Sequence, residues 1–146
     1  MGSPAATKEG GQAMQMGPDV CYLPAPPPPP AGPGGIPTPY PNVGMLNTAD
    51  KVTDKVLIRN KEVLVEGSIV PSSKGDEAGC STIVPPGQKG IASMKNMEKV
   101  EFSKHSSKVK MQGKGTITHT CPTKHNKTNT AGNQGIPSQS VVIVGG

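Results

Sequence analysis

The stretch "KVLIRNKEVLVEG", residues 55–67, indicates how this chain folds. Val56 and Ile58 stand two residues apart before "RNK", and Val63 and Val65 stand two residues apart after it. An apolar pattern of period two that is interrupted by a short polar turn is typical of a β-hairpin. The stretch is therefore predicted to form two short antiparallel strands.

The same design returns 53 residues further along, in "KVKMQGKGTITHT", residues 108–120. Val109 and Met111 occupy the positions of the first apolar pair, "QGK" replaces "RNK", and Thr116 and Thr118 occupy the positions of the second pair. Two such copies indicate an internal pseudo-repeat. A last strand is expected at 140–146, and the chain as a whole is predicted to be a small, turn-rich, all-β protein.

The composition leaves little material for a hydrophobic core. Apolar residues make up 32% of the chain, with one Phe, two Tyr and no Trp, whereas the 19 Gly and 17 Pro account for about a quarter of the 146 residues. A small core usually needs a staple such as disulfides, a metal or partner chains. The three cysteines are an odd number, which argues against a closed disulfide framework and favours a metal.

Charge and composition narrow the kinds of partner and cellular location that the chain can have. The formal charge is +5, but nucleic-acid modules pair basic residues with stacking aromatics, which are nearly absent here, so no nucleic-acid partner is expected. No signal peptide and no membrane span is apparent.

Residues 1–18 are expected to be flexible, and 19–146 to form one domain. Its first part, 19–42, is Pro-rich and is predicted to be an extended strap over the β core.

The segment "THTCPTKHN", residues 118–126, gathers three metal-binding residue types. If "TITHT" is a strand, His119 and Cys121 face one side, and a turn after Pro122 can return His125 to them. Zinc binds about four N or S ligands in a tetrahedron, so one segment could supply three. The segment does not identify the fourth ligand, for which there are three candidates: Cys21, Cys80 and His105. The alternative is a solvated loop in which Cys121 is only a small buried hydrophobe.

Catalysis by the same residues is the weaker interpretation. A Cys–His pair needs an orienting third group and a depressed thiol pKa. Asp76 and Glu77 are the only adjacent carboxylates, and "KGDEAG" is more typical of a turn. The chain is therefore not expected to be an enzyme.

Four blocks of the sequence, in order, resemble the PAAR-like relatives of the Pro-Ala-Ala-Arg repeat proteins, which tip the spikes of contractile injection systems such as type VI secretion. The blocks are "GPDVCYLPAP" (17–26), "PYPNVGM" (39–45), the stretch 55–79 and the stretch 106–146. The literal Pro-Ala-Ala-Arg sequence is absent, and "NKEV" and "GKGT" are taken as the corresponding turns. The resemblance covers roughly 18–146.

The resemblance implies a fold and a role. Such proteins look like small cones of β-hairpins with a pseudo-threefold base, seated one per trimer on a homotrimeric spike protein of the valine-glycine repeat type. They assemble in the bacterial cytoplasm and are ejected with the spike to the extracellular space or a target cell, with transient membrane contact and possible effector cargo. The third side of the base is expected from around 81–102 or from the terminal strand.

The resemblance also implies a zinc-stapled apex, in which the family's cysteine maps to Cys21 and its histidine pair to His119 and His125, with Cys121 as an extra ligand. Spike-binding or core positions are expected among the alternating apolar residues of the two hairpins: Val56, Ile58, Val63, Val65, Val109 and Met111. The alternative function is a zinc-stabilised, Pro-rich adaptor that recruits partner proteins.

Overall fold

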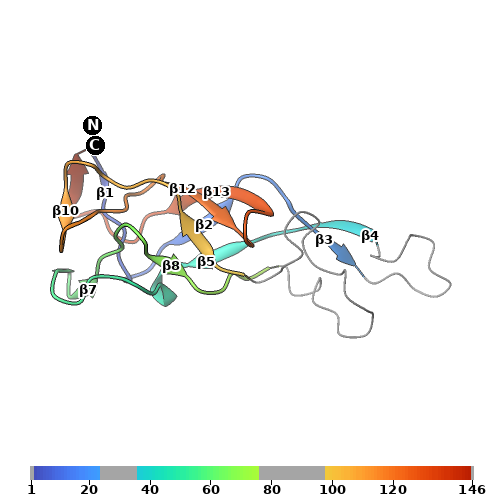
Figure 1. Ribbon diagram of the computed structural model, residues 1–146, viewed down its shortest axis with the longest axis horizontal. Coiled ribbons are helices and arrows are strands. Elements are labelled where there is room, and N and C mark those ends of the chain that lie inside the picture. Colours follow the sequence, from blue (N-terminus) through green and yellow to red (C-terminus); the bar gives the residue numbers. More distant parts are fainter. Residues whose placement is uncertain (1, 24–35, 76–97, 146) are drawn as a thin grey trace.

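The computed structural model describes residues 2–23, 36–75 and 98–145, and these residues are almost entirely β structure (Figure 1). The predicted all-β class is confirmed. No helix within the described ranges is long and apolar enough to cross a bilayer. The elements are β1 (Gly2–Pro4), β2 (Gln12–Gln15), β3 (Asp19–Leu23), β4 (Ile36–Tyr40), β5 (Val43–Met45), η1 (Leu46–Thr48), β6 (Leu57–Ile58), β7 (Lys61–Glu62), β8 (Ile69–Val70), β9 (Val100–Phe102), β10 (Lys110–Met111), β11 (Lys114–Gly115), β12 (Pro122–His125), β13 (Thr130–Ile136) and β14 (Ile143–Gly145).

Six strands form the body of the domain as an antiparallel sheet in the order β5-β2-β13-β12-β9-β8. The sheet curls until its two edges approach each other, because Val43 and Lys74 exchange two backbone hydrogen bonds of 2.8 Å each. The edges are bridged again between Asp50 and Ile69. This nearly closed barrel surrounds the main core, whose buried members are Ala6, Ala13, Leu46, Ala49, Leu64, Val70, Val100, Ile117 and Cys121.

A glycine in the middle of the barrel allows two strands to lie unusually close together. A Cβ added at Gly132 on β13 would collide with the backbone of Met14 and come within 2.7 Å of the Cα of Gln15, both on β2. We expect Gly132→Ala to lower the free energy of unfolding by about 3 kcal/mol, because backbone cannot yield as a side-chain tip can. Urea denaturation measures the loss. Gly10→Ala is the control, since nothing lies within 4 Å of its Cβ position, and an equal loss in both variants would contradict the packing argument.

The two predicted hairpins are confirmed, with the predicted turns. Leu57–Ile58 pairs with Lys61–Glu62, and Lys110–Met111 pairs with Lys114–Gly115 in the same register 53 residues later. Both central residues of each turn have positive φ, at 53° and 62° for Arg59-Asn60 and at 52° and 78° for Gln112-Gly113. Such turns follow the right-handed twist of the strands they join.

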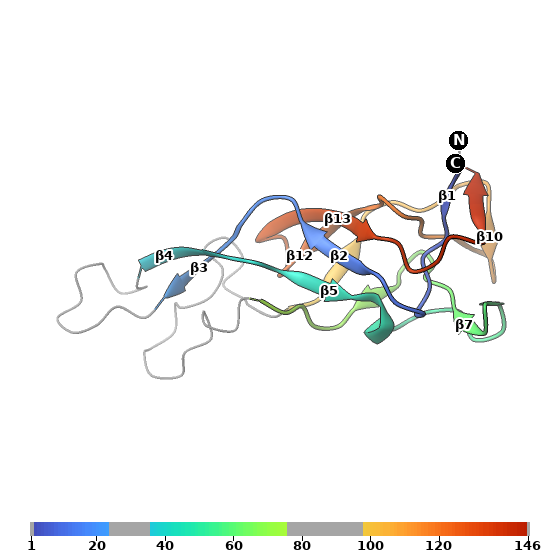
Figure 2. The ribbon, with the colours of Figure 1, turned by 180° about the vertical axis from the view of Figure 1, so that it is seen from behind.

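A third copy of the hairpin is split between the two ends of the chain. β14 pairs with β1, and Val144 lies opposite Ser3 as Ile58 lies opposite Lys61. Gly145 and Gly2 stand where the other copies have their turn, so both termini emerge at this corner (Figures 1 and 2). The predicted terminal strand therefore supplies half of the third side. Residues 98–102 do not, because β9 belongs to the barrel, and 81–97 lie outside the described residues.

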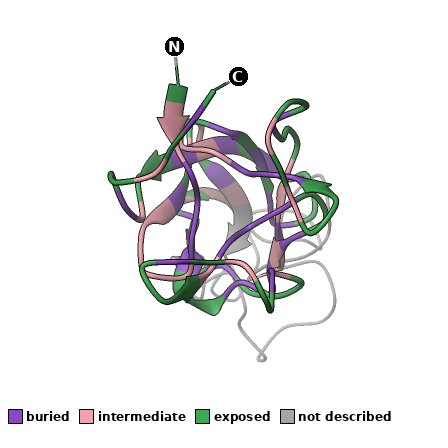
Figure 3. Ribbon diagram, turned by 90° about the vertical axis from the view of Figure 1, so that its left-hand side faces the viewer, coloured by how far each residue is buried: buried purple, intermediate pink, exposed green. Residues whose placement is uncertain are grey.

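The three copies meet in a closed ring of backbone hydrogen bonds. Figure 3 shows the molecule from the end that holds the termini, where these copies lie. Ala6 donates to the carbonyl of Ile117 at 2.9 Å, Ile117 donates to Leu64 at 3.0 Å, and Leu64 donates to Ala6 at 2.9 Å. The residues on either side make three β-bridges in the same cyclic order: Ala5 with Thr118, Thr7 with Val63, and Val65 with Thr116. The implied pseudo-threefold arrangement is thus present in the backbone.

Two expectations about the N-terminal part are wrong. The described part, 2–18, is not a flexible tail: Ala5, Ala6 and Thr7 are fully buried, because the ring cannot close without them, and β1 begins at Gly2. The predicted strap is a ribbon in its described parts, since 19–23 pair with 36–40 instead of covering the core. Prolines at every second residue of β4 fit this pairing, because a strand tolerates proline where its nitrogen faces away from the partner.

Candidate functional site

The end of the domain that holds both termini is the first candidate site, and we call it the base. It consists of the three two-stranded ribbons β1–β14, β6–β7 and β10–β11, grouped at the opposite end of the molecule from the β3–β4 ribbon (Figures 1 and 2). A separate small core lies under these ribbons, with Ala5, Ile58, Val63 and Val144 buried. The three ribbons are therefore packed into one unit.

The six predicted core or spike-binding positions divide by burial. Val63 is fully buried, Val65 and Ile58 are 3% and 6% exposed, and Ile58 and Val63 belong to the small core. Val56, Val109 and Met111 are half-buried. The first three are therefore core positions, and contact with a spike stays a prediction for the last three.

The exposed apolar side chains of the base sit on the strand positions between those predicted. Leu57 is 49% exposed and Ile143 is 54% exposed, and they occupy the same position in two of the three copies. Lys110 holds that position in the third copy and is exposed. Val141, next to β14, is 68% exposed. The base therefore presents two apolar corners and one basic corner around its pseudo-threefold axis.

His119 and Cys121, predicted to share one face of a strand, lie instead in a tight turn. The Cys121 N–H donates to the Thr118 carbonyl at 3.1 Å, and Thr120 has a φ of 68°, so strand alternation does not apply. The His119 N–H donates to the Pro4 carbonyl at 2.8 Å, which places this residue at the ring. Pro122 begins a strand rather than ending one, which is another position that proline tolerates.

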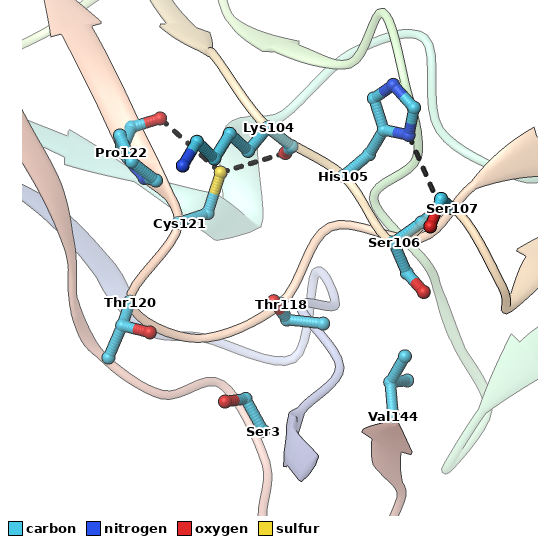
Figure 4. A pocket seen from close by; sticks show the side chains of 10 residues that line it. All are labelled: Ser3, Lys104, His105, Ser106, Ser107, Thr118, Thr120, Cys121, Pro122 and Val144. Atoms are coloured by element: carbon cyan, nitrogen blue, oxygen red, sulfur yellow. Dashed lines mark hydrogen bonds between the residues drawn. The ribbon is translucent and has the colours of Figure 1, made fainter. Parts of the chain in front are cut away.

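The Cys121 side chain borders a pocket of about 390 Å³ between the copies (Figure 4). Its thiol donates to the Lys104 carbonyl at 2.9 Å and lies 3.3 Å from the Pro122 carbonyl. Burial raises the pKa of this thiol, which disfavours the thiolate that metals bind. His105, a candidate fourth ligand on the same pocket, is exposed, and its ring is turned toward Ser106 rather than toward the sulfur (Figure 4).

His125 lies at the far end of β12, about 13 Å of strand away from Cys121. Its ring is fully buried, and both nitrogens are occupied: Nδ1 lies 2.8 Å from Asn42 Oδ1, and Nε2 lies 2.9 Å from Thr123 Oγ1. Asn42 Nδ2 in turn donates to Asp19 at 2.6 Å. The Asp19 carboxylate, also fully buried, accepts further hydrogen bonds from the side-chain amides of Asn126 and Asn129.

The described side chains do not fit the zinc ion that the resemblance implies. No group of three His, Cys, Asp or Glu side chains comes together in the part of the chain that the structure describes. His125 is separated from His119 and Cys121 by the length of β12, and both of its ring nitrogens are occupied by hydrogen-bond partners. Only the backbone of Cys21 is described, and Cys80 lies outside the described residues.

Comparison with known proteins agrees with this architecture. The family model described as "Toxin PAAR-like domain" matches residues 12–132. The chain belongs to the toxin PAAR-like domain family. The PAAR-like domain is also 36% identical over 124 residues to the "DNase toxin Tse7" of Pseudomonas aeruginosa. That match covers 84% of this chain and 30% of the relative, so the chain spans about a third of that protein's length. No solved structure matches the chain.

A signal for the third copy was present in the sequence and was missed. Residues 4–7 read Pro-Ala-Ala-Thr, three of the four letters that name the parent repeat, and they occupy the place in the ring that 62–65 and 115–118 occupy in the other copies. A hairpin divided between the two chain ends has no continuous strand–turn–strand pattern, so the pattern that revealed the other two copies could not reveal this one. If the chain is read as a circle, 139–145 followed by 2–9 aligns with the other two copies of the PAAR-like domain.

Proposed function

We propose that this PAAR-like domain is a structural tip that seats its base on the blunt end of a homotrimeric spike protein in a contractile injection system, one tip per trimer. The closed ring of three hydrogen bonds carries the proposal, because a single chain that repeats its backbone three times around an axis can meet three identical subunits in equivalent ways. The opposite end, with the β3–β4 ribbon, would point away from the spike and toward the target membrane.

The surface chemistry of the base supports this orientation. The exposed Leu57, Val141 and Ile143 provide apolar area, and the half-buried Val109 and Met111 lie on the small core beneath them. Aliphatic side chains that surround an axis suit the end of a β prism, where they would be removed from water. Lys110 at the remaining corner leaves room for one polar contact to the trimer.

Substitutions on the base should abolish the complex without disturbing the fold. We expect Ile143→Asp to weaken binding to the spike trimer at least tenfold, because it places a charge in an apolar interface. Met16→Asp is the matched control, since Met16 is 78% exposed just after β2 on the barrel and not on the base. Size-exclusion chromatography with light scattering gives stoichiometry, and a titration gives affinity. Loss of binding in Met16→Asp with retention in Ile143→Asp would place the spike contact elsewhere.

The relative's name raises the possibility of nuclease activity, and we propose that this chain carries none. The match covers 30% of the relative, and the described residues hold no group of three His, Cys, Asp or Glu side chains that could bind a metal for hydrolysis. Incubation of the purified chain with plasmid DNA and Mg²⁺ tests this, and cleavage that survives repurification would show that the domain is itself an effector.

Assembly in the bacterial cytoplasm, followed by ejection with the spike, is part of the proposal that this domain is a spike tip.

A further inference from the structure

A cluster of polar side chains, most of them fully buried, lies where the β3–β4 ribbon leaves the barrel. We call it the Asp19 centre, and its members are Asp19, Asn42, His125, Asn126 and Asn129. Its members come from β3, from the β4–β5 connection and from the end of β12 with the following turn. Asp19, Asn42, His125 and Asn126 are fully buried. The centre therefore links the start of the ribbon to the barrel at the point where the ribbon departs.

The direction of each hydrogen bond in the centre follows from its chemistry. Asn42 Nδ2 donates to Asp19, so Asn42 Oδ1 faces His125 and can only accept. His125 Nδ1 must then carry the proton. Burial lowers the pKa of His125, so at neutral pH Nε2 is unprotonated and accepts from the Thr123 hydroxyl. The ring is neutral, in one tautomer, and engaged at both nitrogens.

The centre also holds a turn that is unfavourable by itself. Asn126, Lys127 and Thr128 have φ values of 49°, 51° and 71°, a left-handed run that is costly for residues other than glycine. Such a run persists where its surroundings over-determine it. The amide of Asn126, the first residue of the run, and the amide of Asn129, just after it, donate to the Asp19 carboxylate and supply that constraint.

We propose that the Asp19 centre, with His125 as a neutral hydrogen-bonding bridge and not as a metal ligand, is the staple that fastens the β3–β4 ribbon to the barrel. It meets the need that the composition created, since buried amide and carboxylate groups join distant segments where large apolar side chains are scarce. Spike binding involves the base, at the other end of the domain, so this proposal and the docking proposal fail separately.

Nitrogen-15 NMR of the full chain at pH 7.5 tests the role of His125 directly. We expect its signals to show a protonated Nδ1 and an unprotonated Nε2, and to be unchanged both by excess ZnCl₂ and by the chelator dipicolinate. A change in the His125 nitrogen signals with zinc or with chelator would overturn the proposal, because it would show the ring binding a metal.

Thermal unfolding tests the staple. We expect Asp19→Ala to lower Tm by about 10 °C or more, with or without dipicolinate, since it takes a carboxylate acceptor away from the buried amides of Asn42 and Asn126. Asn129→Ala removes one donor and should give a smaller loss, which keeps the test valid if Asp19→Ala does not fold. Asn47→Ala, which removes an exposed amide, is the control and should not change Tm. Wild-type Tm in both Asn129→Ala and Asp19→Ala would overturn the proposal.

Discussion

Leu64→Ala should lower the free energy of unfolding by about 2–5 kcal/mol. Leu64 is among the largest fully buried side chains of the described residues, and it is one of the three residues whose backbones close the ring. Truncation removes transfer free energy and leaves a cavity that the ring cannot collapse to fill, because its backbone is fixed by hydrogen bonds on both sides. Chemical denaturation followed by circular dichroism measures the change.

Leu57→Ala is the matched control in the same hairpin, since it removes the same atoms from a side chain that is 49% exposed. We expect a loss of about 0.5 kcal/mol or less. The equivalent position to Leu64 in the second copy is Ile117, and Ile117→Ala should also be costly because that residue is 1% exposed. Equal, small losses at Leu57 and Leu64 would mean that the ring is not the centre of the fold.

Acidification from pH 7 to pH 4 should remove about 3 kcal/mol of stability through His125 alone. Burial lowers the pKa of His125 to about 4 from its ordinary 6.5, while the charge of Asp19 opposes this shift in part. Between these values the unfolded chain binds a proton that the folded chain does not, so stability falls as pH drops through 6.5 and the loss is complete below about 4. Denaturation midpoints measured at half-unit pH steps test the prediction.

His125→Gln removes the titrating group and should flatten this part of the pH profile, although the variant starts from a lower stability. If the wild type and His125→Gln lose stability in parallel between pH 6.5 and pH 4, the acid sensitivity comes from carboxylates and not from the buried ring.

The predicted metal site at 118–126 shows why a local sequence pattern is not enough to predict a site. Residue types near one another in "THTCPTKHN" suggested a shared site, but β12 begins immediately after Cys121 and separates it from His125 by its whole length. No signal in the segment itself revealed this. The partners that occupy the His125 ring and the neighbouring turn, Asn42 and Asp19, lie about 80 and 100 residues away in the sequence, so only the folded chain brings them together.

By itself the sequence determined the two hairpins, their turns and their 53-residue repeat, because alternation and turn chemistry are local and survive in any context. It also determined that a staple was needed, because composition limits apolar burial. The tertiary structure alone decided that the third copy joins the two chain ends, since pairing between β1 and β14 depends on where the barrel places them. It likewise decided which apolar residues face water and which polar residues do not, since burial depends on packing between distant segments rather than on local pattern.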